Sequence, residues 1–391
     1  MKVMFLAGEA SGDALGAELL CGLQKACSSL NIPLEAFGAG GERLAKAGAE
    51  IAVDLTKHAV VGVWEVLKHY RTLRGLFMRL LQLAIDKKPD VVVLVDYPGF
   101  NLRFAKALKK ALRGHSETDW SPKIVQFISP QIWAWHESRI HQIARDMEMI
   151  LSIFPFEKAW YAAREPRLRV EYVGHPLMDR YKAYKERVRQ HSQIEPIVPY
   201  HVLLLPGSRE KELSRHLPIL QEVVRLAGAQ QKIHFKIVVP RESLVLHVRE
   251  LFSTLSGNVQ IDVQAGQLAE ALLWADAAIA SSGTVTMECA YFQVPTVILY
   301  RTSFLTAFLG RIFIKVKRIG MPNLLMNNKA VYPEFIQEEA RADAIAAAML
   351  RFLTDKEVRK ETQEDLRTML GTLGGEGACL RAAEKVLSLM R

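Results

Sequence analysis

The stretch KKPDVVVLVDYPGFN, residues 87–101, contains an apolar run that ends on an aspartate followed by a Pro-Gly pair. Its core, Val91–Val95, shows no alternation of polar and apolar residues, which is typical of a strand buried on both faces of a parallel sheet. Asp96 then has two explanations. Its short side chain suits turns and helix starts, or it lies where ligands bind, beyond the carboxyl ends of the strands of an open α/β sheet.

Similar β-rich runs alternate with helical patterns through most of the chain, and this alternation predicts an α/β fold with doubly wound parallel sheets. Strands are expected at residues 3–6, 34–37, 91–95, 124–127, 149–152 and 170–173, and again at 202–205, 235–239, 259–263, 277–280 and 296–299.

The polar segment 185–200, with Pro196 and Pro199, predicts a linker between two domains. We therefore expect two Rossmann-like domains at 1–184 and 201–335 that face a cleft, followed by a helical tail at 336–391. Two placements stay open for this tail: on the first domain of its own chain, or on that of a partner chain.

Composition narrows the class of protein. The length of 391 residues suits two globular domains. No apolar run approaches the ~20 residues of a membrane span. Because the N-terminus also lacks the length of a signal peptide, we expect a cytoplasmic protein. The four cysteines form no CxxC pair, and His136 and His141 do not have zinc-protease spacing, so neither a disulfide framework nor a zinc site is expected. The formal net charge of +9 favours an anionic partner.

Two predicted strand-to-helix turns suit phosphate. In VLLLPGSREKE, a strand leads directly to Gly207, Ser208 and Arg209. Glycine allows close approach of the backbone, the N-terminus of the following helix offers unpaired N–H donors to an anion, and the arginine adds a forked cation. Because many strand-to-helix turns contain Gly-Ser, this segment alone does not establish a phosphate site.

The second turn lies in ADAAIASSGTVTMECA and carries Ser282, Gly283 and Thr284. Glu288 comes one helical turn after Thr284, where its carboxylate could accept both hydroxyls of a ribose. It could equally be an ordinary helix acid, but glycine, hydroxyls and acid together favour a nucleotide.

Neither turn is a P-loop, and GEASGD near the N-terminus does not match GxGxxG. The chain has no Asp-x-Asp pair that could bridge a metal to a diphosphate. We therefore expect no metal and no cofactor, with Arg209, backbone donors and helix dipoles stabilising a leaving nucleotide.

Two stretches combine cations with apolar residues. Residues 60–85 predict a helix whose apolar stripe includes Leu67 and Phe77, while Arg71 and Arg74 lie off the stripe. Residues 300–333 contain six Lys or Arg and no acid. Each stretch could be core-packed with a basic outer face, or could lie on an anionic membrane.

Several motifs then stand in the order found in one family. LAGEASGD, VDYPGFN, SPQIWAW, LPGSR, SSGTVTMEC and MPNLL resemble lipid-A-disaccharide synthases, and the resemblance covers residues 4–325. It implies a GT-B-type inverting glycosyltransferase that joins UDP-2,3-diacylglucosamine to 2,3-diacylglucosamine 1-phosphate. The products would be a β-1,6-linked lipid A disaccharide 1-phosphate and UDP. Such enzymes are peripheral on the cytoplasmic face of the inner membrane of Gram-negative bacteria, and a homodimer is an option.

The resemblance also implies roles for individual residues. Asp96 would be the general base for the acceptor 6-hydroxyl. The donor UDP would lie on Gly207, Ser208, Arg209, Ser282, Gly283, Thr284, Glu288 and Asn323. Further residues of the same cleft would be Glu9, Ser11, Gly12 and Asp13. Lipid or membrane would contact Trp64, Leu67, Arg71, Arg74, Phe77, Phe304, Phe308, Arg311 and Lys315.

Two rival functions would each explain part of this pattern. A non-hydrolysing UDP-N-acetylglucosamine 2-epimerase would share the two domains and the Gly-hydroxyl-Glu turn, but it would not explain two acid-free basic stretches. A nucleic-acid-binding protein is suggested only by the net charge, and it would need aromatic stacking platforms among its basic residues. Here the cations are interleaved with aliphatic residues, which favours lipid.

Overall fold

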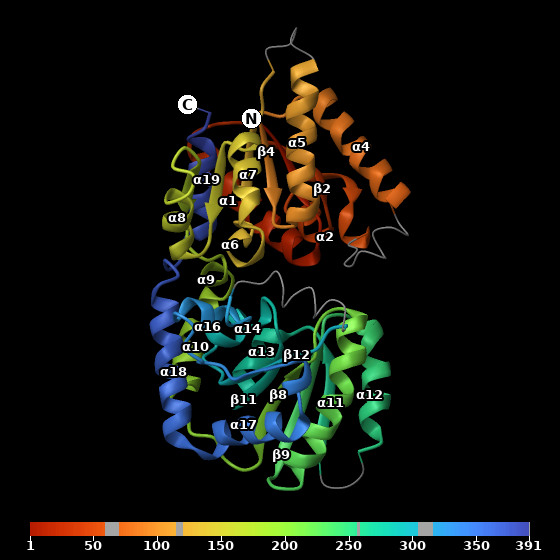
Figure 1. Ribbon diagram of the computed structural model, residues 1–391, viewed down its shortest axis with the longest axis vertical. Coiled ribbons are helices and arrows are strands. Elements are labelled where there is room, and N and C mark those ends of the chain that lie inside the picture. Colours follow the sequence, from red (N-terminus) through yellow and green to blue (C-terminus); the bar gives the residue numbers. More distant parts are fainter. Residues whose placement is uncertain (59–69, 115–119, 256–258, 304–315, 391) are drawn as a thin grey trace. The chain divides into compact units, whose positions relative to one another are not determined.

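The computed structural model describes residues 1–58, 70–114, 120–255, 259–303 and 316–390. They form two compact units, of which the first comprises Met1–Asp179 and Leu373–Arg391 and the second Arg180–Thr372. Each unit is an α/β layer structure with one parallel sheet between helices (Figure 1).

The first unit contains a seven-stranded sheet in the order β3-β2-β1-β4-β5-β6-β7, in which every pair of neighbours is parallel. Its strands are β1 (Lys2–Ala7), β2 (Glu35–Gly40), β3 (Glu50–Asp54), β4 (Val91–Val95), β5 (Lys123–Phe127), β6 (Met149–Ser152) and β7 (Arg169–Tyr172). Its α-helices are α1 (Ala10–Ser29), α2 (Glu42–Lys46), α4 (Tyr70–Lys87), α5 (Pro98–Gly114), α6 (Ile132–Trp135), α7 (Ile140–Asp146), α8 (Pro155–Ala162), the boundary helix α9 (Leu177–Arg180) and α19 (Ala378–Leu387). Short 3₁₀ helices are η1 (Leu55–His58) and η2 (Glu137–Arg139).

The second unit repeats the plan with a six-stranded parallel sheet, β10-β9-β8-β11-β12-β13. Its strands are β8 (Tyr200–Leu205), β9 (Ile233–Val239), β10 (Gln260–Ala265), β11 (Ala277–Ser281), β12 (Thr296–Tyr300) and β13 (Glu334–Ile336). Its α-helices are α10 (Lys185–His191), α11 (Glu210–Gly228), α12 (Val245–Ser253), α13 (Leu268–Trp274), α14 (Val285–Tyr291), α16 (Met321–Leu325), α17 (Ala342–Thr354) and α18 (Lys356–Gly371). Its 3₁₀ helices are η3 (Lys182–Tyr184), η4 (Glu242–Leu244) and η5 (Gln337–Glu339).

The predicted doubly wound α/β class is confirmed, because both sheets have the strand order of Rossmann-like folds. All eleven predicted strands are present, while β3 and β13 were not predicted. These two are edge strands, and only one residue of β3 and none of β13 is fully buried, so neither has the continuous apolar run that marks a central strand.

The unit boundary differs from the predicted one. Residues 185–191 of the expected linker form α10, which belongs to the second unit because Arg187 makes a two-point ion pair with Glu270 of α13, at 2.9 and 2.7 Å. The expected helical tail is also divided. Helices α17 and α18 pack in the second unit, and only α19 joins the first.

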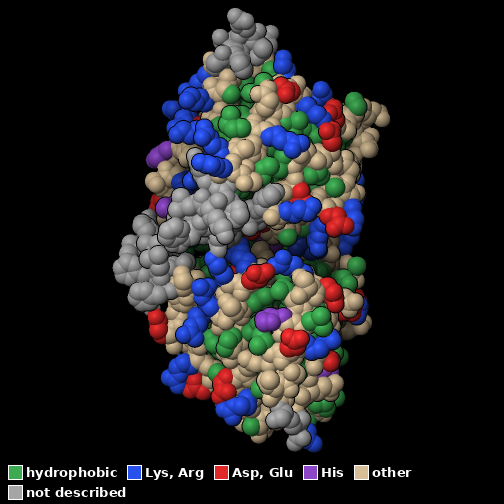
Figure 2. Space-filling view, turned by 90° about the vertical axis from the view of Figure 1, so that its right-hand side faces the viewer, with side chains coloured by type: hydrophobic (Ala, Val, Ile, Leu, Met, Phe, Trp, Pro, Cys, Tyr) green, Lys and Arg blue, Asp and Glu red, His purple; other side chains and the backbone are tan. Residues whose placement is uncertain are grey.

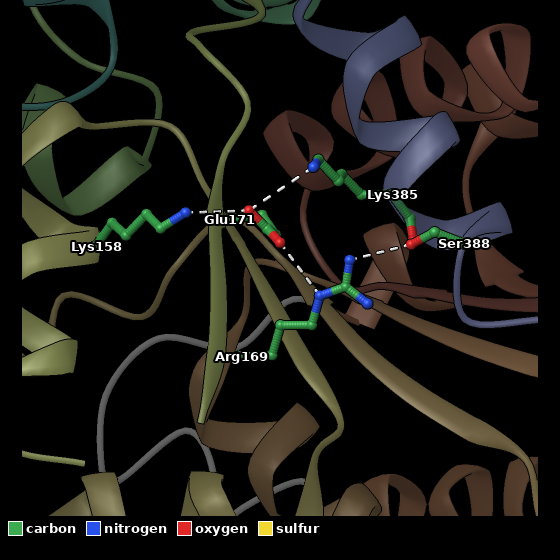
Figure 3. A network of polar contacts seen from close by, with 5 residues as sticks. All are labelled: Lys158, Arg169, Glu171, Lys385 and Ser388. Atoms are coloured by element: carbon green, nitrogen blue, oxygen red, sulfur yellow. Dashed lines mark hydrogen bonds and ion pairs between the residues drawn. The ribbon is translucent and has the colours of Figure 1, made fainter. Parts of the chain in front are cut away.

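Helix α19 is held on the first unit of its own chain. The Asp179 carboxylate accepts the N–H groups of Gly377 and Cys379 at the start of α19. Figure 3 shows a second tie, in which Glu171 of β7 lies between Lys158, Arg169 and Lys385, and Arg169 also donates to Ser388 Oγ at 3.1 Å. These contacts explain why residues so far apart in sequence form one unit.

Among the described residues, no helix combines the length and apolarity that a membrane span requires.

Candidate functional site

Asp96 lies at the point where the strand order of the first sheet reverses. Strand β4 pairs with β1 in a register that aligns Ala7 with Val95, so the turns that follow these strands, at Glu9 and Asp96, lie side by side at one edge. Ligands of open α/β folds bind at this switch point. The structure thus brings together two acids that are 87 residues apart in sequence.

Asp96 is partly buried and has a left-handed backbone, with φ 47°, and Tyr97 repeats this conformation with φ 45°. Burial raises the pKa of the Asp96 carboxyl above its ordinary value, and the negative charge of Glu9 raises it further. The pKa of the neighbouring Tyr97 is raised by the same two causes. A raised pKa makes this carboxylate a stronger proton acceptor than a free aspartate, which suits a general base.

Glu9 is the N-cap residue of α1, and its neighbour Gly8 lies directly under the ring of Tyr97. A side chain at position 8 would meet the Tyr97 ring at 2.2 Å, so only glycine permits this packing. Ser11 and Gly12 occupy the first turn of α1 behind Glu9.

Asp13, expected in the ligand-binding cleft, makes its hydrogen bonds within the first unit. It is 4% exposed, and its carboxylate accepts the N–H groups of Gly41, Arg43 and Leu44 at 2.6, 2.9 and 3.2 Å. These are the unpaired donors at the start of α2, so Asp13 caps that helix. With both oxygens occupied, its carboxylate is not offered to a ligand.

The second unit repeats the switch-point geometry. Strands β8 and β11 are neighbours, so the turn with Gly207, Ser208 and Arg209 lies beside the turn with Ser282 and Gly283. The structure therefore joins the two predicted phosphate turns. Ser208, Arg209, Gly283 and Thr284 are exposed and Ser282 is partly buried.

An internal carboxylate already occupies the first of these turns. Glu212, in the first turn of α11, accepts the N–H of Ser208 at 3.0 Å and that of Arg209 at 3.4 Å, and its other oxygen lies 3.3 Å from the Arg209 guanidinium. The same donors were predicted to bind diphosphate. Glu212 thus stands where an anionic ligand would be held, and sequence reasoning missed it.

Glu288 lies in α14, directly after the second turn, and it is mostly buried. It accepts a hydrogen bond from the Tyr181 hydroxyl at 2.8 Å and lies 3.5 Å from Arg180. Burial and the charge of Glu288 raise the pKa of Tyr181, so this phenol remains a donor. The contact holds Glu288 in one orientation.

Asn323, expected to contact UDP, is enclosed within the second unit. It is 0% exposed, its Nδ2 donates to Tyr332 O and to Glu334 at 2.7 Å each, and its Oδ1 accepts the Tyr332 N–H at 2.8 Å. Every polar atom of the side chain is used to join α16 to β13.

The predicted lipid-contacting residues are divided. Trp64, Leu67, Phe304, Phe308, Arg311 and Lys315 lie outside the described residues. In α4, Arg71 and Arg74 are exposed, but Phe77 packs edge-on against Phe100 and Phe104 of α5 at 5.3 and 5.7 Å. The apolar stripe of α4 continues through the fully buried Leu80 and Ala84, so it faces the core and not a membrane.

A basic stripe on α5 was missed from the sequence. Arg103, Lys106, Lys110 and Arg113 are exposed at spacings of three, four and three residues, which place them on one helix face. The helix contains no acid, and none of the four forms an ion pair within the described part of the chain. Figure 2 shows clusters of Lys and Arg side chains on this side of the first unit. The signal was present in the sequence as an acid-free segment with helical spacing of cations.

The model of the family "Lipid-A-disaccharide synthetase" matches residues 3–388. The chain belongs to this family. Related sequences are lipid-A-disaccharide synthases of Trichlorobacter lovleyi, 37% identical over 100% of this chain and 97% of the relative, and of Myxococcus xanthus, 34% identical over 100% and 97%. Family membership makes the protein a glycosyltransferase enzyme.

Solved structures agree at the level of the fold. UDP-GlcNAc 2-epimerase from Neisseria meningitidis bound to UDP-GlcNAc superposes with a TM-score of 0.62 at 14% identity, covering 99% of this chain and 100% of that one. CalG4, the calicheamicin glycosyltransferase, gives 0.57 at 14% identity, covering 100% and 98%. Identities this low show only the shared GT-B fold, so the predicted epimerase alternative gains no support from them.

Proposed function

We propose that the protein joins UDP-2,3-diacylglucosamine to 2,3-diacylglucosamine 1-phosphate, releasing UDP and a β-1,6-linked disaccharide 1-phosphate. The observation that carries this proposal is Asp96, a raised-pKa carboxylate at the switch point of the first sheet, in a chain of this family. A second switch point with two phosphate-type turns, in the other unit, supports a nucleotide-sugar donor.

In the proposed reaction, Asp96 accepts the proton of the acceptor 6-hydroxyl as that oxygen attacks the anomeric carbon of the donor. The bond from this carbon to the UDP oxygen breaks in the same displacement, and its electron pair leaves with UDP. A single displacement inverts the anomeric centre, so no covalent sugar–enzyme intermediate forms. Glu9 keeps the carboxylate of Asp96 basic through its own negative charge.

The leaving UDP would gain negative charge, and the second unit offers Arg209 together with the N–H groups of the two turns to stabilise it. Glu288, at the start of the helix that follows the second turn, would accept the ribose hydroxyls. Because the sequence has no Asp-x-Asp pair, we propose that no metal is needed. Activity is then expected to persist in excess EDTA, and a strict requirement restored by added magnesium or manganese would contradict this.

The reaction is tested by one incubation with both acylated substrates, read by mass spectrometry. The expected result is the disaccharide 1-phosphate together with stoichiometric UDP, formed about 10²–10⁴-fold more slowly when Asp96 is replaced by Asn. Conversion of the donor alone into an isomeric UDP-sugar would instead support the epimerase alternative.

We further propose that the protein works at the cytoplasmic face of the inner membrane. Support comes from the exposed cations Arg71, Arg74 and Arg79 of α4 and from the basic stripe of α5, which packs beside it. Basic residues near an anionic bilayer contribute about 1 kcal/mol each. Since the apolar stripe of α4 is in the core, the described part of this contact is mainly electrostatic, and salt should weaken it strongly.

A flotation assay with anionic liposomes tests this surface. Reversal of Arg71, Arg74 and Arg79 to Glu should reduce binding while turnover on detergent-dispersed substrate stays near wild type. Lys232, Arg241 and Lys360, exposed on the second unit, provide a control with the same charge change. Equal loss in both variants would show that net charge, and not this surface, governs binding.

A further inference from the structure

Two buried amides hold the turn that carries Asp96. Asn101 of α5 donates from Nδ2 to the main-chain oxygens of Val95 and Asp96, at 3.2 and 2.7 Å. Gln126 of β5 donates from Nε2 to the oxygens of Asp96, Phe127 and Ile128, at 3.2, 3.3 and 3.1 Å. Both side chains thus converge on a single atom, the Asp96 carbonyl oxygen, from two different elements.

The turn needs such support because its backbone is unfavourable for these residues. Asp96 and Tyr97 are consecutive left-handed residues, and Ile128, on the adjacent strand end, is a β-branched left-handed residue with φ 67°. Non-glycine residues rarely adopt this conformation, and they keep it only where the surroundings enforce it. Gln126 is bonded to the carbonyls of both Asp96 and Ile128, so one side chain restrains both turns.

The amides are not explained by stability alone. Asn101 is 1% and Gln126 0% exposed, and within the described residues Asn101 Oδ1 and Gln126 Oε1 have no hydrogen-bond partner. A buried acceptor without a partner costs free energy, so each unpaired amide oxygen offsets part of the stability that the amide nitrogen contributes at the main-chain oxygens. What these amides provide, and an apolar residue cannot, is a defined orientation of the Asp96 peptide.

We infer that Asn101 and Gln126 are positioning residues that hold Asp96 in its left-handed turn, so that its carboxylate meets the acceptor hydroxyl. The inference rests on the proposed role of Asp96 as general base. Misplacement of a reacting group by about 1 Å can cost about 100-fold in rate, so each amide should act mainly on kcat. The affinity for UDP, a ligand of the second unit, should not change.

The test compares Gln126→Met and Asn101→Leu with Gln142→Met. Gln142 is a matched control because its Nε2 also donates to a main-chain oxygen of the first unit, that of Leu102, at 3.0 Å. We expect kcat to fall about 10- to 100-fold in the first two variants and less than twofold in the control, with calorimetric UDP affinity retained in all three. The acid limb of the pH–rate profile should also shift in the two variants, because the surroundings of the Asp96 carboxyl change.

If kcat in both variants stayed within twofold of the control while only their melting temperatures fell, the amides would be structural and the inference overturned. Should either variant fail to fold, Asn101→Ser removes one donor with a smaller disturbance, and the same kcat criterion applies to it. Asp96→Asn separates the two proposals. If it is active, the general base is misassigned; if it is inactive while the amide variants are active, only the positioning role fails.

Discussion

The strand-end turns of the two units reach unusual backbone conformations in opposite ways. In the first unit, Asp96, Tyr97 and Ile128 are left-handed although none of them is glycine. In the second unit, the turns after β8 and β11 use Gly207 and Gly283, with φ of 119° and 157°. Glycine adopts such angles without strain, whereas Asp96 is restrained by Asn101 and Gln126.

This difference follows from what each turn offers. An anion can be held partly by main-chain N–H groups, so the second unit can have glycine at these turns, and nothing lies within 4 Å of where a Gly283 side chain would begin. A general base is a side-chain group, here the carboxylate proposed for Asp96, so the first unit must keep a side chain at this turn and stabilise its backbone by other means.

Replacing Asp96 by Asn should lower turnover by about 10²–10⁴-fold while the fold and UDP affinity are retained, because the amide cannot accept the acceptor proton. Steady-state rates and UDP calorimetry measure the two effects separately. A variant that kept more than about a third of the wild-type rate would remove Asp96 as the base.

The stabilities of the two units should depend on pH in opposite directions. In the first unit, Glu157 of α8 is 0% exposed, and its carboxylate accepts a hydrogen bond from Trp133 Nε1 at 3.1 Å. Burial raises its pKa from 4.5 to about 7. The stability that protonated Glu157 gives the first unit is fully present below pH 4.5 and is lost as pH rises through 7. This difference corresponds to about 3 kcal/mol.

In the second unit, His216 of α11 is buried and neutral. Its Nδ1–H donates to Pro206 O at 2.7 Å, its Nε2 accepts the Arg301 N–H at 3.0 Å, and burial lowers its pKa. Its contribution is present above 6.5 and is lost as pH falls through the lowered pKa. Hydrogen exchange at pH 5.5 and 8 should show less amide protection at pH 8 in the first unit and less at pH 5.5 in the second. Glu157→Gln should remove the pH dependence of the first unit only. The same loss in both units at one pH would contradict this assignment.

In the second unit, Arg209→Ala and Glu288→Ala should each weaken UDP binding tenfold or more, because a charge-assisted hydrogen bond contributes roughly 1.5–3 kcal/mol. Glu288→Ala should also reduce discrimination against 2′-deoxy-UDP, whereas Arg209→Ala should not. Calorimetry checks both, with Arg241→Ala as a surface control. Unchanged affinity in both variants would remove these residues from the donor site.

The smallest effect concerns Glu212, which occupies the N–H donors of Ser208 and Arg209. Glu212→Gln should tighten UDP binding about fivefold, because about 1 kcal/mol of charge repulsion near the diphosphate is removed while glutamine can still cap the helix. Glu210→Gln, in the same helical turn, controls for net charge. Weaker UDP binding in the Glu212 variant would show that this turn does not hold the diphosphate.

The sequence by itself determined the fold class, because uninterrupted apolar runs such as Val91–Val95 occur where both faces of a parallel strand are buried. It also indicated Asp96 and the two glycine turns, since their chemistry is carried by residues that are contiguous in the chain. The lipid-facing interpretation of residues 60–85 could not be decided in the same way. An amphipathic helix has one period whether its apolar face meets a membrane or a core, and in α4 Leu80 and Ala84 are buried in the core.

Tertiary structure alone decided which side chains from distant segments of the sequence meet. Asn101 and Gln126 converge on Asp96, and Glu9 joins it, because parallel neighbours bring together turns from distant segments. Asp13 and Asn323 have the residue types of a polar site, yet Asp13 hydrogen-bonds to main-chain groups and Asn323 to both main-chain and side-chain groups within the protein. Hydrogen bonds form at about 3 Å, a scale that no sequence pattern specifies, so only folding selects the partners of a buried polar group.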